Sequence, residues 1–279
     1  MNSENVQQFS FSTEVKIFTG FFLCFIFIYN QSFELVLKEW LESSDYSYGP
    51  LIIPISLYMI VRNRSVLSQL QINRHWFPLL GLLACVPVWM FGHLIGVQII
   101  EVMLVFVLFV FLVWAYWGTE FISHIKMPVF LLILSAPIWG PLGVLLQEIT
   151  SVVSYSMLRI LGVPAFIEGH YITVPNGKFE IEQVCGGLRY FLAALVTVLV
   201  FVYFEYEKRS IQIYVTCTIV LVSIIANWIR VVIIMMVGHL YGMNIDFVQD
   251  HDTFGWVMFA IFLGGAFFLV IRLTRQWRE

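Results

Sequence analysis

The sequence predicts an all-α polytopic membrane protein of about eight transmembrane helices. A short extracytoplasmic β-hairpin and an amphipathic helix are expected between the fifth and sixth spans. Hydrophobic residues make up 60% of the 279 residues and charged residues only 12%, against roughly 45–50% and 25% in soluble domains. A soluble fold of this length cannot bury so much apolar surface, so lipid must be the solvent for much of the chain.

Eight apolar runs supply the predicted spans, because a bilayer core about 30 Å thick needs about 20 mainly apolar residues per helix. The second run is short and contains Pro50 and Pro54 near its start, which favours a broken or half-buried helix. No internal repeat of the transporter kind is visible, so residues 1–279 are treated as a single integral membrane domain. The predicted spans cover residues 17–37, 49–61, 76–95, 97–118, 127–147, 187–204, 211–240 and 253–273.

Basic residues are concentrated in the loops on one side of these spans, whereas the opposite loops are mainly acidic. The basic loops and the C-terminal tail contain Arg62, Arg64, Arg74, Lys208, Arg209, Arg272, Arg275 and Arg278. Because basic loops stay in the cytoplasm, both termini are predicted to be cytoplasmic. Cys185 and His251 then lie on the outer side of the membrane.

The predicted outer segment before the sixth span is long enough to have structure of its own. Residues 149–161 have mixed helical spacing of apolar residues and are expected to lie along the membrane interface. Residues 170–182 then form two short alternating runs around Pro175, Asn176 and Gly177. Asn-Gly between such runs is typical of a β-hairpin, which would lead the chain directly to Cys185.

Cys185 lies in the stretch EQVCGGLRYF, just before the sixth apolar run. A helix N-terminus favours the thiolate form of cysteine, and Gly186 and Gly187 would allow a substrate backbone to come close. Arg189, one turn further on, could stabilise the same anion. The alternative is that Cys185 is only a small residue in a tight turn.

Arg230 lies inside a predicted span, where an arginine costs about 2.5–3.5 kcal/mol on insertion scales. About ten apolar residues separate it from the outer end of the helix. The side chain is therefore poorly placed to extend its charged group to the membrane interface. Asn227 and Ser223 precede it by three and seven residues and share its helix face. These residues predict a polar stripe inside the bundle.

His251 stands between Asp250 and Asp252, just before the last span. Imidazole titrates near neutral pH, and the neighbouring carboxylates could orient the ring. Trp256 could form part of a binding wall, although tryptophan is also common at membrane interfaces. By itself a loop histidine is usually solvated. A thiol, a buried cation and an imidazole on the same side of the membrane together indicate cysteine-based acyl transfer.

Three motifs carry a family resemblance. They are E-x-V-C-G-G-L-R-Y at 182–190, A-N-x-x-R at 226–230 and D-H-x-x-F-G-W at 250–256. With the stretch YGPLIIPIS at 48–56, they make the chain resemble the exosortases, multi-pass enzymes of the bacterial inner membrane. Many relatives carry Ser or Ala where this chain has Gly186, which is a change between small residues.

The resemblance implies a cysteine sorting protease-transpeptidase with Cys185, Arg230 and His251 as its catalytic residues. The expected partners are exported proteins whose C-terminal tails carry a Pro-Glu-Pro signal, an apolar helix and a basic cluster, together with membrane lipids. Cleavage is expected on the periplasmic side, linked to exopolysaccharide-associated sorting. The acceptor nucleophile is left open between water, an amine, a lipid and a sugar.

Two other classes of function stay open on the sequence alone. A transporter or channel would use the polar stripe to line a path, and a non-catalytic scaffold of a polysaccharide export system would need none of the three residues. No Cys or His cluster has metal-ligand spacing, so neither a metal nor another cofactor is expected. No nucleic-acid partner is expected either.

Overall fold

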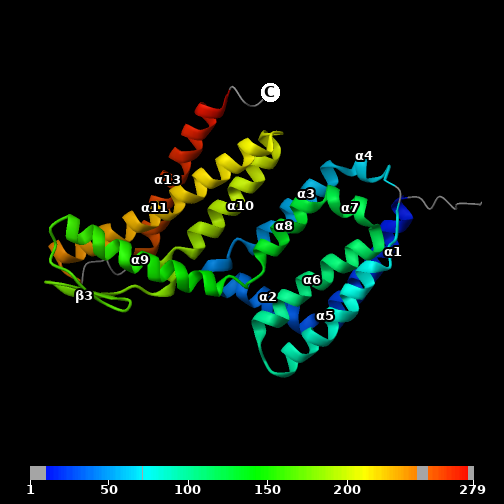
Figure 1. Ribbon diagram of the computed structural model, residues 1–279, viewed down its shortest axis with the longest axis horizontal. Coiled ribbons are helices and arrows are strands. Elements are labelled where there is room, and N and C mark those ends of the chain that lie inside the picture. Colours follow the sequence, from blue (N-terminus) through cyan, green and yellow to red (C-terminus); the bar gives the residue numbers. More distant parts are fainter. Residues whose placement is uncertain (1–10, 71, 244–250, 276–279) are drawn as a thin grey trace, which may run out of the picture. The chain divides into compact units, whose positions relative to one another are not determined.

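The structure, a computed structural model, describes residues 11–70, 72–243 and 251–275, with Phe11, His251 and Asp252 described by their backbone alone. The chain divides into two compact units, Met1–Ile138 and Trp139–Glu279, whose α-helices are labelled in Figure 1. The expectation that residues 1–279 act as one domain stays a prediction. Unit 1 contains α1 (Phe11–Ile28), α2 (Asn30–Glu42), η1 (Ser44–Tyr46), α3 (Gly49–Arg62), α4 (Arg64–Leu67), α5 (Phe77–Leu94), α6 (Gln98–Trp117), α7 (Thr119–His124) and α8 (Lys126–Ser135). Unit 2 contains α9 (Gly140–Ile160), β1 (Phe166–Glu168), β2 (Tyr171–Val174), β3 (Gly177–Glu180), η2 (Gln183–Gly186), α10 (Leu188–Glu205), α11 (Arg209–Tyr241) and α13 (His251–Thr274).

Unit 1 is held together by apolar helix packing and by a few buried polar pairs. Glu101 in the first turn of α6 is only 4% exposed and accepts a 2.7 Å hydrogen bond from the Ser32 hydroxyl on α2. The Trp89 indole donates to the same hydroxyl over 3.0 Å, and His93 Nδ1 lies 3.3 Å from the Glu101 carboxylate. The buried carboxylate is thereby satisfied by partners on two other helices, as a group removed from water requires.

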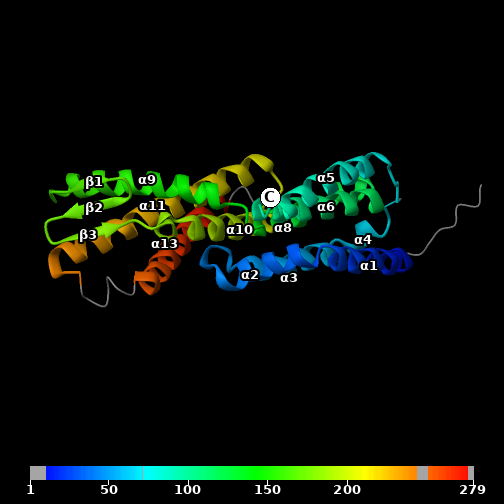
Figure 2. The same cartoon turned by 90° about the horizontal axis from the view of Figure 1, so that it is seen from below.

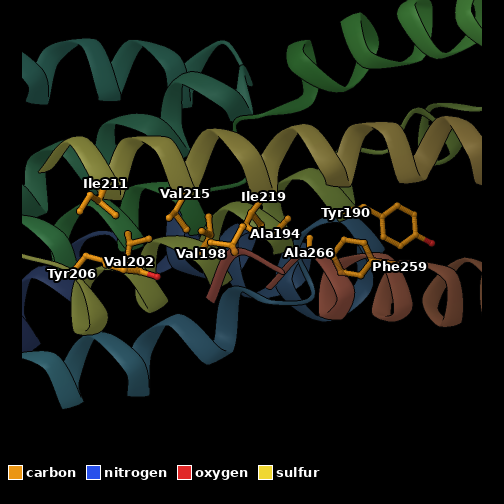
Figure 3. Close-up of a cluster of buried hydrophobic side chains, with 11 residues drawn as sticks. Tyr190, Ala194, Val198, Val202, Tyr206, Ile211, Val215, Ile219, Phe259 and Ala266 are labelled. Carbon is orange, nitrogen blue, oxygen red and sulfur yellow. The ribbon is translucent and has the colours of Figure 1, made fainter. Parts of the chain in front are cut away.

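Unit 2 is built around α10, α11 and α13, whose apolar residues recur at helical spacing. On α10, Tyr190, Ala194, Val198 and Val202 follow one another every four residues and face the same core. Figure 3 shows this core between the three helices, with Tyr190 at one end and its hydroxyl directed away from the cluster. The helices therefore pack along an apolar seam that ends at a polar group.

A three-stranded antiparallel sheet in the order β1-β2-β3 lies along α9 and α11 (Figure 2). Ile172, Val174 and Ile181 are buried in one core with residues of both helices. The opposite face is exposed: Tyr171 lies across from Glu180, whose carboxylate raises the pKa of the tyrosine. Strands β2 and β3 flank Pro175 and Asn176, so the turn lies one residue before the predicted Asn-Gly pair, and β1 was not predicted from the sequence.

The structure is mostly helical, as expected of a polytopic membrane protein. In the described residues, five helices are long and apolar enough to cross a membrane, or up to seven if each of two bent helix pairs is one span. The predicted count of eight is therefore not reached. The five are α5, α6, α10, α11 and α13, at the positions predicted for them. Only Pro78 and Gly92 of α5 are buried, so most of its apolar surface is available to lipid.

The three other predicted spans are not confirmed as single straight helices long enough to cross a membrane. The run at 17–37 is divided between α1 and α2, which bend by 82° at Tyr29. The run at 49–61 forms α3, which at 14 residues is shorter than the about 20 needed to cross. The run at 127–147 is interrupted between α8 and α9, and the segment 149–161 is mostly the continuation of α9 rather than a separate helix.

The break after α8 has a local cause. Ala136 has extended backbone angles, φ −64° and ψ 131°, and the next residue is Pro137. A residue before proline is pushed out of the helical region, and proline itself has no N–H to continue the helix. The apolar run therefore continues where the helix does not.

Candidate active site

Cys185 lies in a short loop between the sheet and α10, which we call the Cys185 loop (residues 181–187). Its chain comes from β3, makes the single turn η2, and enters α10 at Leu188. Two side chains of α9 hold its backbone: Gln147 Nε2 donates to Ile181 O over 2.7 Å, and Thr150 Oγ1 donates to Gly186 O over 3.1 Å. The loop is thus hydrogen-bonded to a neighbouring helix on both sides of Cys185.

Asn227 of α11 holds the same loop from another direction. Its Nδ2 donates to both Cys185 O and Gly186 O over 3.1 Å, and the side chain is only 4% exposed. Gly187 caps α10 in the left-handed conformation, with φ +98°, and a Cβ at this position would overlap the Asn227 amide. Glycine is therefore required here both by its backbone angles and by the close approach of Asn227.

Arg230 follows Asn227 by one turn of α11 and is only 2% exposed. Its Nη1 donates a 2.6 Å hydrogen bond to the hydroxyl of Tyr190, which is equally buried. Its Nε has no hydrogen-bond partner, and no carboxylate pairs with the guanidinium within the described part of the chain. A buried cation with unused donors is suited to binding an anion.

The start of α13 completes the surroundings of Arg230. A Cβ on Gly255 would overlap the Tyr190 hydroxyl and come within 2.9 Å of Arg230 Nη1. Glycine at this position therefore lets α13 pack directly against the bonded pair. This contact connects the third sequence motif to the first two.

Cys185 and Arg230 line the same pocket, which has a volume of about 110 Å³. One wall is the end of β3 with the two residues that follow it, and the other wall is α11. The remaining lining residues are Phe179, Glu180, Ile181, Glu182, Val231, Ile234 and Met235. The structure therefore brings two of the three predicted residues, Cys185 and Arg230, to the same pocket.

Two other predicted site residues, Arg189 and Trp256, are not among the residues that line this pocket. Arg189 is buried, and its guanidinium lies 5.8 Å from the Trp256 ring and 5.9 Å from the Tyr190 ring, among aromatic groups. Trp256 packs edge-on against Tyr190 at 5.9 Å. Asp250 and the side chain of His251 lie outside the described residues. The backbone of His251 begins α13, one helical turn before Gly255.

The sequence did not indicate Tyr190, Gly255, Gln147 or Thr150 as site residues. Tyr190 and Gly255 were present in the quoted motifs, so their position beside Arg189 and Trp256 was an available signal. Gln147 and Thr150 gave no such signal, because a polar residue on a long helix reveals its partner only when the fold is known. The described residues contain no group of three or more His, Cys, Asp and Glu suited to a metal ion.

No curated protein and no solved structure matches the chain. Residues 40–268, which include the Cys185 loop, Asn227, Arg230 and Gly255, match the family described as transmembrane exosortase (Exosortase_EpsH). This match covers most of the 279 residues and confirms the resemblance read from the motifs. The chain belongs to the transmembrane exosortases.

Proposed function

We propose that the protein is a membrane-embedded cysteine peptidase and transpeptidase of the bacterial inner membrane, with its site open to the periplasm and both termini cytoplasmic. Its proposed substrates are exported proteins with a C-terminal signal that contains Pro-Glu-Pro, an apolar helix and a basic cluster. Its proposed role is protein sorting associated with exopolysaccharide. Membership of the exosortase family supports this class of reaction.

The observation that carries the proposal is the shared pocket of Cys185 and Arg230. A thiolate is a strong nucleophile toward a carbonyl carbon, and the attack places negative charge on the carbonyl oxygen. A buried guanidinium whose Nε is unused can stabilise that oxyanion in a medium of low dielectric constant. A channel or a scaffold has no need for this pairing of groups.

The reaction proceeds in two steps. The Cys185 sulfur forms a bond to the scissile carbonyl carbon, and the carbon–nitrogen bond breaks to leave a thioester on the enzyme. We assign to protonated His251 the proton that the departing amine takes up. The neutral imidazole then removes a proton from the acceptor, which attacks the thioester carbon; the carbon–sulfur bond breaks, and the Cys185 thiolate and the imidazolium are restored. Arg230 acts in both steps on the carbonyl oxygen; pairing with the glutamate of the tail is its alternative role.

Co-expression with a reporter that ends in such a tail tests the proposal. Cys185→Ala is expected to abolish processing while the protein still accumulates in the membrane, and Cys217→Ala, a matched change on α11, is expected to process normally. A thioester-linked adduct on Cys185 that hydroxylamine releases would identify the intermediate. Full processing by Cys185→Ala would refute the mechanism, and a solute flux in vesicles that survives this change would favour a transporter.

A further inference from the structure

Strand β3 is an edge strand whose outer side faces no other strand among the described residues. In an antiparallel pair, every second residue directs its N–H and C=O toward the partner strand, and the residues between direct theirs away. The bond from Ile181 N to His170 O shows that positions 181 and 179 are directed toward β2. The backbone groups of Lys178 and Glu180 are therefore directed toward the outer edge.

This outer edge ends at the Cys185 pocket. Glu180, at the end of β3, and Glu182, two residues later, both line the pocket that contains Cys185. The amide of Cys185 donates over 2.9 Å to Glu182 O, so the chain turns toward the thiol directly after the strand. A peptide that followed this edge would be led to the Cys185 sulfur.

The size and lining of the pocket indicate what such a peptide would place in it. The volume of the pocket, about 110 Å³, is well below that of small-molecule sites, which is about 300–1,000 Å³. Val231, Ile234 and Met235 of α11 form an apolar wall opposite the edge of β3. This space suits one side chain of an extended peptide, because in a strand every second side chain points to the same face.

We propose that the substrate binds by strand addition: an extended segment next to its scissile bond pairs with the outer edge of β3 as a fourth strand and places one side chain against α11. This mode gives affinity through main-chain hydrogen bonds and specificity through the side-chain pocket. The inference rests on the proposed peptidase function and specifies how that site recognises its substrate.

A proline at Glu180 tests the edge directly, because it removes an N–H that faces away from β2 and so leaves the existing sheet bonds intact. Glu180→Ala is the matched control, since it removes the same carboxylate but keeps the N–H. We expect kcat/KM for a synthetic Pro-Glu-Pro tail peptide to be about fivefold to tenfold lower in Glu180→Pro than in Glu180→Ala. Thermal unfolding and the alkylation rate of Cys185, followed by mass spectrometry, should match between the two.

The complementary test changes the substrate. In a series of tail peptides, one backbone amide at a time, outside the prolines, is N-methylated. Strand addition predicts that methylation lowers kcat/KM by about fivefold at alternate positions on one side of the scissile bond and by less than about twofold between them. Equal values for Glu180→Pro and Glu180→Ala, together with a series that lacks this alternation, would overturn the proposal.

Binding of the same fluorescent peptides to the Cys185→Ala protein separates this inference from the proposed function. Binding that alternates along the methylated series, without cleavage by the wild-type protein, would support strand addition and refute the peptidase assignment. Cleavage without alternation would refute strand addition alone. Absence of both binding and cleavage would refute both.

Discussion

The guanidinium of Arg230 donates to the hydroxyl of Tyr190 over 2.6 Å, and each of the two residues is only 2% exposed. Tyr190 belongs to α10, which follows the Cys185 loop, whereas Arg230 belongs to α11. A hydrogen bond between them therefore fixes the cation relative to the helix that begins directly after Cys185, Gly186 and Gly187.

Tyr190→Phe is expected to lower kcat for tail cleavage by about tenfold with a smaller change in KM. The substitution keeps the ring but removes the acceptor for Arg230, and a hydrogen bond to a charged group contributes about 1.5–3 kcal/mol. The control is Tyr206→Phe, the same change at the other end of the same core, where the hydroxyl bonds to Thr274. It should lower the melting temperature and leave kcat unchanged. If the two variants have equal kcat, Tyr190 does not position Arg230.

Gly255→Ala is expected to impair cleavage because its Cβ would overlap the Tyr190 hydroxyl and crowd Arg230. Overpacking of this kind typically costs about 1–3 kcal/mol. Gly264→Ala on the same helix adds a methyl group with no heavy atom within 4 Å, so it should leave activity unchanged. Steady-state cleavage by the two purified variants makes the comparison. Wild-type activity in Gly255→Ala would show that α13 can move away from Arg230 without loss of function.

Asn227→Asp is expected to be more damaging than Asn227→Ala. The amide donates to two carbonyl oxygens of the Cys185 loop, and a carboxylate at the same place would repel them. Loss of a buried donor costs about 1–3 kcal/mol, and an unpaired buried charge costs more. The rate of Cys185 alkylation measures a change in the conformation of the Cys185 loop, and thermal unfolding measures the stability of the protein. An unchanged alkylation rate in both variants would argue against a role for Asn227 in holding the loop.

Arg230→Lys is expected to lower kcat by about 100-fold. Lysine keeps the charge but loses the planar fork, which here bonds to Tyr190 through Nη1 and has no hydrogen-bond partner at Nε. One oxyanion donor is typically worth about 2.7–4 kcal/mol. Arg159→Lys is the control, since Arg159 also donates to a tyrosine, Tyr155, over 3.3 Å but is exposed. Wild-type turnover by Arg230→Lys would reduce the role of Arg230 to that of a point charge.

The positions of the thiol and the buried cation could be predicted because both are chemically out of place in apolar sequence. Cys185 precedes two glycines at the start of an apolar run, and Arg230 interrupts another such run. The contacts that hold these two residues in place were harder to predict from the sequence. Tyr190 resembles any aromatic residue of a membrane helix, and its role becomes evident only when α10 and α11 are packed together.

The helix breaks were missed for a different reason. Hydropathy reports whether residues prefer lipid, not whether the backbone continues straight. Tyr29 and the segment at Ala136 and Pro137 lie within apolar runs, so the runs appeared continuous while the helices bend or end there. Strand β1 was missed because three residues are too few to show an alternating pattern.

Asn227 and Arg230 occupy neighbouring turns of the 33-residue helix α11. Asn227 bonds to the Cys185 loop, and Arg230 supplies the buried cation. Any sliding or rotation of this helix would displace both attachments by nearly the same amount. The spacing between the Cys185 loop and the Arg230 guanidinium is thereby tied to the pitch of a single helix rather than to the packing of many.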